Sequence, residues 1–191
     1  VTTSHAMHGS ANAIGGQCQT IKHRYGVLDP SAYKFEGAAR TIKFALGENP
    51  IRVHGEGRGV QPRTRMGVEH VIRDAFEKGL DYKEKWATYE ADKKKNPDTA
   101  PPLYNERYQT MADILDGKII IQCHSYRADE ILMLMRVLND YGVRRITFQQ
   151  QRPITIDREE RRFQPVNPRI AILWLKDHGG VVRQRSVQRM E

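Results

Sequence analysis

The chain has 191 residues, of which 39% are hydrophobic and 28% are charged, and its formal net charge is +8. This length and composition favour one large or two small globular domains over a disordered chain. Two widely separated cysteines argue against a disulfide framework or a zinc knuckle, and the lack of an apolar run of eighteen residues excludes a membrane span.

Three strands are predicted in the first part of the chain. Residues 1–7 and 19–25 read as short strands, and residues 9–17 between them read as a loop because its three glycines permit positive φ. The third strand covers residues 41–46, where three apolar side chains alternate with polar ones and Lys43 lies on the polar face.

A long helix is the clearest element of the middle region. Residues 50–63 are rich in Gly and Arg and predict a loop, and Thr64 is placed to cap the helix that follows. The helix covers about residues 66–89 and is followed by a charged, proline-containing linker at 93–102. Its apolar stripe consists of Val68, Ile72, Ala75, Phe76, Leu80, Trp86 and Tyr89.

The region after the linker alternates helices and strands. We expect a helix over 105–115 that ends at Gly117, a strand over 118–123, a helix over 128–141 and a strand over 143–148. Helix and strand in alternation with short connections are typical of βα units around a parallel sheet. The sequence therefore predicts an α/β fold.

The segment KIIIQCHSYRADEI, residues 118–131, holds the strongest functional candidate. His124 lies at the end of a short apolar strand, and a helix follows at once. The carboxyl ends of strands are the usual place for chemistry in α/β proteins, so His124 is a candidate metal ligand or base. The alternative is a histidine that only hydrogen-bonds a neighbouring loop.

Four blocks carry a resemblance to a known family: GSANAIGGQ, IKFALGENP, PRTRMGVEHVIRDAF and CHSYRADEILMLMR. In this order and spacing they resemble amidohydrolase-superfamily enzymes related to imidazolonepropionase, over roughly residues 1–149. The resemblance implies part of a (β/α)₈ TIM barrel that contains the middle strands only. It also implies a divalent metal, usually zinc, and hydrolysis of amide or cyclic-amide C–N bonds by a metal-activated water.

The resemblance also implies roles for individual residues. His124 falls on a metal ligand of the fifth barrel strand, and Lys43 is the candidate for a carboxylated bridging lysine, with an ordinary buried-stem lysine as the alternative. Tyr126 and Arg127 are placed to hold a substrate carboxylate, since a guanidinium fork suits that group.

A second group of substrate-binding candidates lies in the glycine-rich segment. Asn12, Gly15, Gly16 and Gln17 resemble the loop that closes over the barrel mouth. The alternative is a glycine-rich connection without a ligand.

The chain departs from the family pattern at both ends. Residues upstream of the first block supply no His-x-His pair, Gln122 stands where relatives often have histidine, and residues 150–191 do not align. This Arg-rich tail is expected to be disordered, a frame-shift product or a genuine replacement of the carboxyl end. Because several metal ligands and the general-base Asp are missing, we assign no catalytic residue, regard metal binding as doubtful, and expect the chain alone to be inactive.

Two further expectations concern partners and location. Residues 151–191 carry nine Lys or Arg against five Asp or Glu, so a basic nucleic-acid-binding protein is the alternative function, although no surface aromatics are interleaved with these charges. Otherwise we expect a small-molecule substrate, no membrane partner, and oligomers formed through exposed sheet edges. No signal peptide is visible and the chain lacks an initiator methionine, so we expect that the native amino terminus is missing and leave the compartment open.

Overall fold

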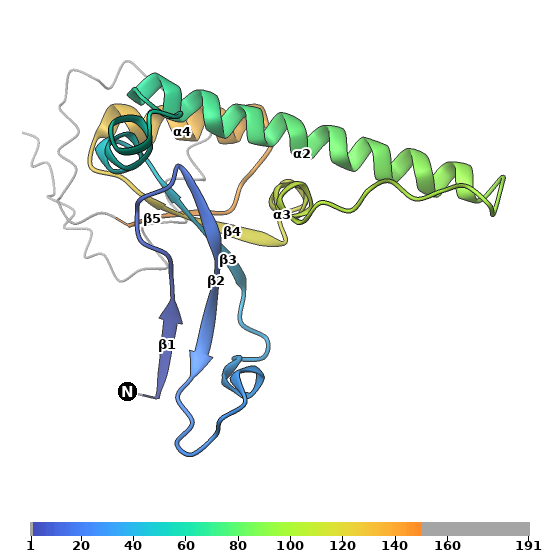
Figure 1. The fold of residues 1–191 in the computed structure, drawn as a ribbon, viewed down its shortest axis with the longest axis horizontal. Coiled ribbons are helices and arrows are strands. Elements are labelled where there is room, and N and C mark those ends of the chain that lie inside the picture. The colour runs from blue at the N-terminus through green and yellow to red at the C-terminus, as the bar shows by residue number, and fades with distance from the viewer. Residues whose placement is uncertain (1, 150–191) are drawn as a thin grey trace, which may run out of the picture. The chain divides into compact units, whose positions relative to one another are not determined.

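A computed structural model describes residues 2–149 of the chain, and these residues form a mixed α/β structure (Figure 1). Its single sheet has the strand order β1-β2-β3-β4-β5. The strands are β1 Thr3–Ala6, β2 Ile14–Lys22, β3 Arg40–Ala45, β4 Ile119–His124 and β5 Ile146–Gln149.

The helical elements range from single turns to one long helix. They are the 3₁₀ turn η1 Pro30–Tyr33, α1 Glu48–Ile51, the π turn η2 Arg52–Glu56, α2 Arg65–Lys93, α3 Glu106–Leu115 and α4 Ala128–Asp140. Within residues 2–149 no helix is both long and apolar enough to cross a membrane.

The sheet divides into a parallel part and an antiparallel part. β3 pairs in parallel with β4, and β4 with β5. Parallel neighbours need a crossover connection, which α2 and α3 supply between β3 and β4 and α4 supplies between β4 and β5. The prediction of βα units is thus confirmed for these strands, whereas the antiparallel pairing of β1 with β2 and of β2 with β3 was not foreseen.

Local capping chemistry sets several of the helix ends. The Thr64 hydroxyl accepts a hydrogen bond from the Gly67 amide at 3.0 Å, as expected for the cap of α2. Gly117 and Gly142 follow α3 and α4 with φ of +71° and +69°, a backbone region that favours glycine. These predicted ends of the helices are confirmed.

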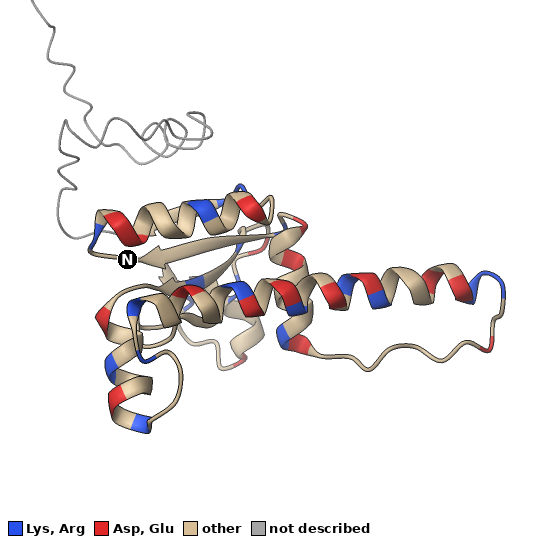
Figure 2. Cartoon of the chain, turned by 90° about the horizontal axis from the view of Figure 1, so that it is seen from above, with Lys and Arg blue, Asp and Glu red and all other residues tan. Residues whose placement is uncertain are grey.

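Charged side chains alternate in sign along α2 (Figure 2). Two ion pairs join residues four apart on this helix, Glu69 with Arg73 and Asp74 with Lys78. Such pairs add a few tenths of a kcal/mol each to an exposed helix, and α2 continues four residues beyond the predicted end at Tyr89.

Two segments that were predicted as loops contain helical or strand residues, so these two predictions are wrong in part. β2 begins at Ile14, inside the segment 9–17 that was expected to be a loop, and it pairs with β3 through an irregular register between Ile14 and Gln17. A glycine pair suits such a bulge because it lets backbones approach closely. The segment 50–63 was also expected to be a loop, but its first residues are helical, in α1 and η2.

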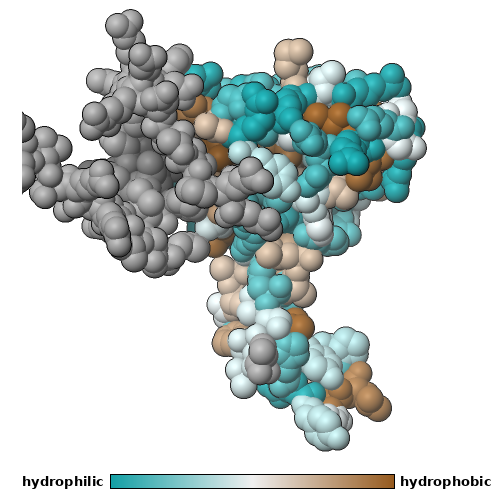
Figure 3. Space-filling model, turned by 90° about the vertical axis from the view of Figure 1, so that its left-hand side faces the viewer, coloured by the Kyte–Doolittle hydropathy of each residue, from teal (hydrophilic) through white to brown (hydrophobic). Residues whose placement is uncertain are grey.

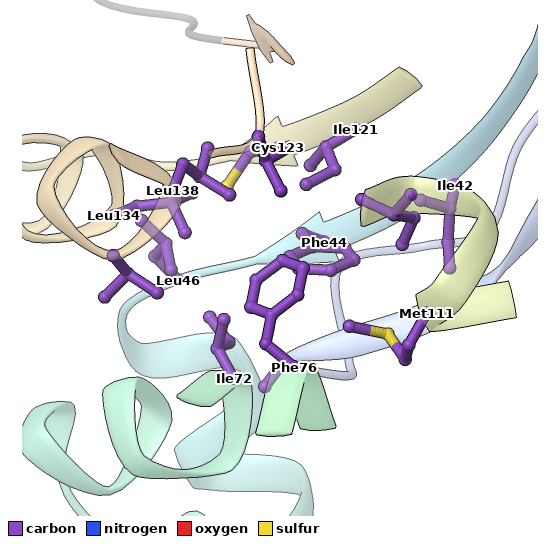
Figure 4. Close-up of a cluster of buried hydrophobic side chains, with 14 of the residues drawn as sticks. Ile42, Phe44, Leu46, Ile72, Phe76, Met111, Ile121, Cys123, Leu134 and Leu138 are labelled. Atoms are coloured by element: carbon purple, nitrogen blue, oxygen red, sulfur yellow. The ribbon is translucent and has the colours of Figure 1, made fainter. Parts of the chain in front are cut away.

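The hydrophobic core lies on the face of the sheet that α2, α3 and α4 cover (Figures 1 and 4). Phe44 of β3 and Phe76 of α2 are fully buried at its centre, and Cys123 of β4 lies beside Leu138 of α4. On the outer surface seen in Figure 3, hydrophilic side chains cover most of the described part and apolar ones occur in small groups.

The predictions for the carboxyl-terminal tail fall on residues 150–191, which lie outside the described residues. The nucleic-acid alternative depended on that tail.

Candidate active site

The carboxyl ends of the three parallel strands meet at one edge of the sheet. Ala45 of β3 is the register partner of His124, and His124 is the partner of Gln149 at the end of β5. Helix α4 begins four residues after His124, and α1 begins three residues after Ala45. This arrangement of strand ends and helix starts is the usual location of sites in α/β proteins, and it agrees with the predicted position of His124.

The His124 imidazole contacts the loops that surround this edge. Asn49 places its side-chain amide 3.3 Å from His124 Nε2 and 2.8 Å from the Ser10 hydroxyl oxygen. The Tyr126 ring lies against the imidazole edge-on, with 4.5 Å between the ring centroids.

Burial and a neighbouring positive charge influence the protonation of His124. Burial and, secondarily, the nearby Lys43 charge lower the pKa of His124 below its usual range, which favours the neutral ring. A hydrogen bond from the Asn49 amide to Nε2 requires the tautomer that carries its proton on Nδ1. The structure therefore matches the alternative of a histidine bonded to a neighbouring segment, and the predicted role of His124 as a metal ligand stays a prediction.

Lys43 lies on the sheet face opposite to the hydrophobic core and is only 4% exposed. Its Nζ donates a hydrogen bond to Gln149 Oε1, and the Gln149 amide donates to Gln122 Oε1 at 2.8 Å. Burial lowers the pKa of Lys43. Gln149 was not predicted as a partner of Lys43. Gln122 is two residues before His124 and therefore shares its face of β4.

The predicted carboxylate-binding residues are close to His124 but differ in availability. Tyr126 is 46% exposed and contacts the imidazole. The guanidinium of Arg127 already forms two hydrogen bonds of 2.9 Å with the Asp129 carboxylate in the first turn of α4. A substrate carboxylate would have to displace Asp129 from this fork.

The glycine-rich candidates lie in a different place. Asn12, Gly15, Gly16 and Gln17 line a cavity of about 840 Å³ that is also lined by side chains of α2 and by residues of α3. The described residues that line this cavity do not include His124, Lys43, Tyr126 or Arg127. The structure thus places His124, Tyr126 and Arg127 at the strand edge and the glycine-rich candidates along this cavity, with Gly15 beside the backbone of Lys43.

His54 is a cavity residue that sequence reasoning missed. Its Nε2 lies 2.7 Å from Asn12 Oδ1, and it is provided by the π turn η2, in a segment that was expected to be a loop. A lone histidine in a Gly-rich segment gave no signal of this contact.

The two glycines of β2 lie in close contact with their neighbours, Gly15 with backbone and Gly16 with the end of a side chain. A Cβ at Gly15 would lie 3.0 Å from the Lys43 carbonyl oxygen, and a Cβ at Gly16 would lie 2.2 Å from Nε2 of the His8 ring. The loop interpretation for Gly15, Gly16 and Gln17 is therefore wrong, because these residues belong to a paired strand. Their predicted contact with a substrate stays a prediction.

A buried ion pair, also missed by the sequence analysis, joins the helices around the strand edge. Arg65, the first residue of α2, pairs with Glu130 of α4 and with Glu48 of α1, the latter at 3.2 Å. Glu130 is 5% exposed, and a Cβ at Gly47 would lie 3.1 Å from its Oε2. This pair fixes the helix starts relative to the strand ends.

The residues near this edge do not fit the metal that the resemblance implies. Across residues 2–149 no three His, Cys, Asp or Glu side chains converge closely enough to hold an ion. Cys123 points into the hydrophobic core, and burial strongly raises the pKa of its thiol, so it stays protonated. On its sheet face the neighbours of His124 are the Lys43 amine and the carboxamides of Gln122 and Gln149. Because zinc needs about three ligand side chains, His124 with these neighbours does not form a zinc site.

Comparison with known proteins gives two matches. A crystal structure of an amidohydrolase from Thermotoga maritima MSB8 superposes with a TM-score of 0.67 and 33% sequence identity, covering 78% of this chain and 36% of that one. The amidohydrolase tasK of Hapsidospora irregularis is 43% identical over 86 residues, which are 41% of this chain and 9% of the relative.

Both matches cover only part of the related proteins. The chain spans about a third of the solved relative and less than a tenth of the curated one. No protein-family model matches the chain.

Proposed function

Because the chain is related to the amidohydrolase superfamily, we propose that it forms part of a hydrolase that acts on amide or cyclic-amide C–N bonds of a small molecule. In this proposal β3, β4 and β5 are consecutive strands of a (β/α)₈ barrel. The parallel register of these strands and their crossover helices support this assignment.

The observation that carries the proposal is the position of His124. Its neutral imidazole lies at the carboxyl edge of the parallel strands, where the substrate of such a barrel binds, and Tyr126 covers one side of the ring. A neutral imidazole at this edge accepts a hydrogen bond or a proton from a bound molecule once the Asn49 amide moves away.

We further propose that this chain alone does not turn over a substrate. The resemblance implies a metal that activates water, and the donor set of residues 2–149 does not provide for one, so no step is assigned to a metal. Among residues 2–149, β1 and β5 are the outermost strands of the sheet, and oligomers or further strands would pair there.

The test is to add N-acyl amino acids and imidazolone-type amides to the purified chain and to measure binding and turnover separately. Binding is followed by the NMR signals of the His124 and Tyr126 side chains, and turnover by product formation. We expect concentration-dependent shifts at these two residues and no product.

A matched control tests whether the binding signal depends on His124. His124→Ala should abolish the response of Tyr126, whereas His23→Ala, at an exposed histidine that contacts Ser4, should leave it unchanged. Shifts that are equal in both variants, or no shift with either amide class, would contradict the proposed site. Turnover by the wild-type chain would contradict the proposed inactivity.

A further inference from the structure

Three adjacent parallel strands each place one polar side chain into a connected group, here called the amine–amide cluster. It consists of Lys43 of β3, Gln122 of β4 and Gln149 of β5. Lys43 and Gln122 are direct register partners on neighbouring strands. The cluster lies on the face of the sheet opposite to the hydrophobic core and immediately below the strand edge where His124 lies.

Hydrogen bonds run through the cluster in one direction. The Lys43 amine donates to the Gln149 carbonyl oxygen, and the Gln149 amide nitrogen donates to the Gln122 carbonyl oxygen at 2.8 Å. Lys43 is 4% exposed, whereas Gln122 and Gln149 are half-buried. Buried polar groups that satisfy one another in this way are costly to separate.

The chemistry of these groups opposes zinc. Carboxamide oxygens are poor ligands for zinc, which prefers imidazole, thiolate and carboxylate. Because the Lys43 amine donates its hydrogen bond to the Gln149 amide oxygen, a bridging group on Nζ would have to break this contact. The cluster also fills the space beside His124 with groups that already have partners.

We infer that the amine–amide cluster excludes zinc from this sheet face and keeps Lys43 as an unmodified amine, and that Gln122→His with Gln149→His would turn the same face into a zinc site. The inference concerns metal uptake, so it does not depend on whether the chain hydrolyses an amide.

Strand geometry supports the second half of this inference. Gln122 and His124 are two residues apart on β4, so they share a face and are separated by about 6.6 Å along the strand. Gln149 is the register partner of His124, and its side chain touches Gln122. Imidazoles at 122, 124 and 149 would therefore surround one point, and three imidazoles are a sufficient ligand set for zinc.

The experiment measures metal content and Co²⁺ absorption of the full chain after chelator treatment and dialysis against Zn²⁺ or Co²⁺. We expect no stoichiometric metal in the wild-type chain and about one ion per chain in the double variant, with the absorption bands of four-coordinate Co²⁺. Adding His124→Ala to the double variant should abolish the gain.

A composition-matched control distinguishes a built site from scattered histidines. Gln19→His with Gln109→His adds the same two imidazoles on β2 and α3, away from the cluster, and should gain no stoichiometric ion. Circular dichroism verifies folding of each variant. If the double variant does not fold, Gln149→His alone places an imidazole beside His124 and should bind Zn²⁺ more tightly than the wild-type chain does.

Two results would overturn the inference. One is stoichiometric zinc in the wild-type chain that Lys43→Ala removes. The other is a folded Gln122→His, Gln149→His variant, or a folded single variant in its place, that binds zinc no better than the matched control.

Discussion

The two faces of the parallel strands differ in what they carry. Toward the helices, Phe44 and Ile121 are fully buried in the core. On the other face, Lys43, Gln122 and Gln149 form a hydrogen-bonded cluster below His124. The same backbone thus supports a face that supplies stability through apolar burial and a face whose side chains define the chemistry.

The largest expected effect comes from the core face. Phe44→Ala removes a fully buried ring that packs against Phe76, and it should lower the free energy of unfolding by about 3–5 kcal/mol. Urea unfolding followed by circular dichroism measures this change. Ile42→Val, a smaller deletion on the same face, should cost only about 0.5–1.5 kcal/mol and serves as the folded reference. Equal losses for the two variants would contradict the assignment of Phe44 to the centre of the core.

The next effect concerns the ion pair that holds the strand edge. Arg65→Ala leaves the buried Glu130 carboxylate without its partner and should cost about 1–3 kcal/mol, less than a fully buried pair because Arg65 is partly exposed. Glu130→Gln in the same chain should recover part of the loss, which a double-mutant cycle of unfolding free energies measures. The exposed pair Asp74–Lys78 is the control, and its removal should cost under about 0.5 kcal/mol. Additive effects of Arg65→Ala and Glu130→Gln would show that the pair does not act as a unit.

A smaller effect is expected on the polar face. Lys43→Met keeps the length of the side chain and removes a buried amine, so the lost hydrogen bond and the relieved desolvation should offset each other within about 1 kcal/mol. The bond between Gln149 and Gln122 remains. An unfolding measurement that finds Lys43→Met as damaging as Phe44→Ala would remove the distinction between the two faces.

The smallest effect is a pH dependence at the strand edge. Because the pKa of His124 is lowered in the folded chain, the unfolded chain binds more protons as the pH falls below the ordinary value of 6.5. His124 should therefore contribute a loss of stability below that pH, down to its folded-state pKa. The difference in unfolding free energy between the wild-type chain and His124→Asn, measured between pH 7 and pH 5, isolates this contribution. A difference that does not vary with pH would contradict the lowered pKa.

The sequence predicted the elements that are defined by apolar periodicity and by caps. The Thr64 cap, the glycines after α3 and α4 and most of the α2 stripe depend on residues that are neighbours in the chain. Leu80 of the predicted stripe is an exception, because it is 44% exposed. The same local reasoning placed His124 at a strand end, and the comparisons confirm the predicted relationship to amidohydrolases.

The missed features depend on contacts between residues that are far apart in the chain. Gly15 and Gly16 read as a loop because glycine has a low strand propensity. They lie in the bulge between Ile14 and Gln17, the residues that pair with β3, and this bulge has no signature in the local sequence. Lys43 and Gln149 are separated by 106 positions, so their hydrogen bond has no periodic signature in the sequence. The partition of the site candidates into a strand-edge group and a cavity group has the same cause.

The most direct test of the polar face is ¹³C NMR of the wild-type chain in ¹³C-bicarbonate, because it reads the chemical state of Lys43 itself. If Lys43 is an amine held by Gln149, no carbamate carbon signal should appear, with or without Zn²⁺. A carbamate signal that disappears in Lys43→Ala would show a carboxylated lysine, and it would contradict the amine–amide cluster.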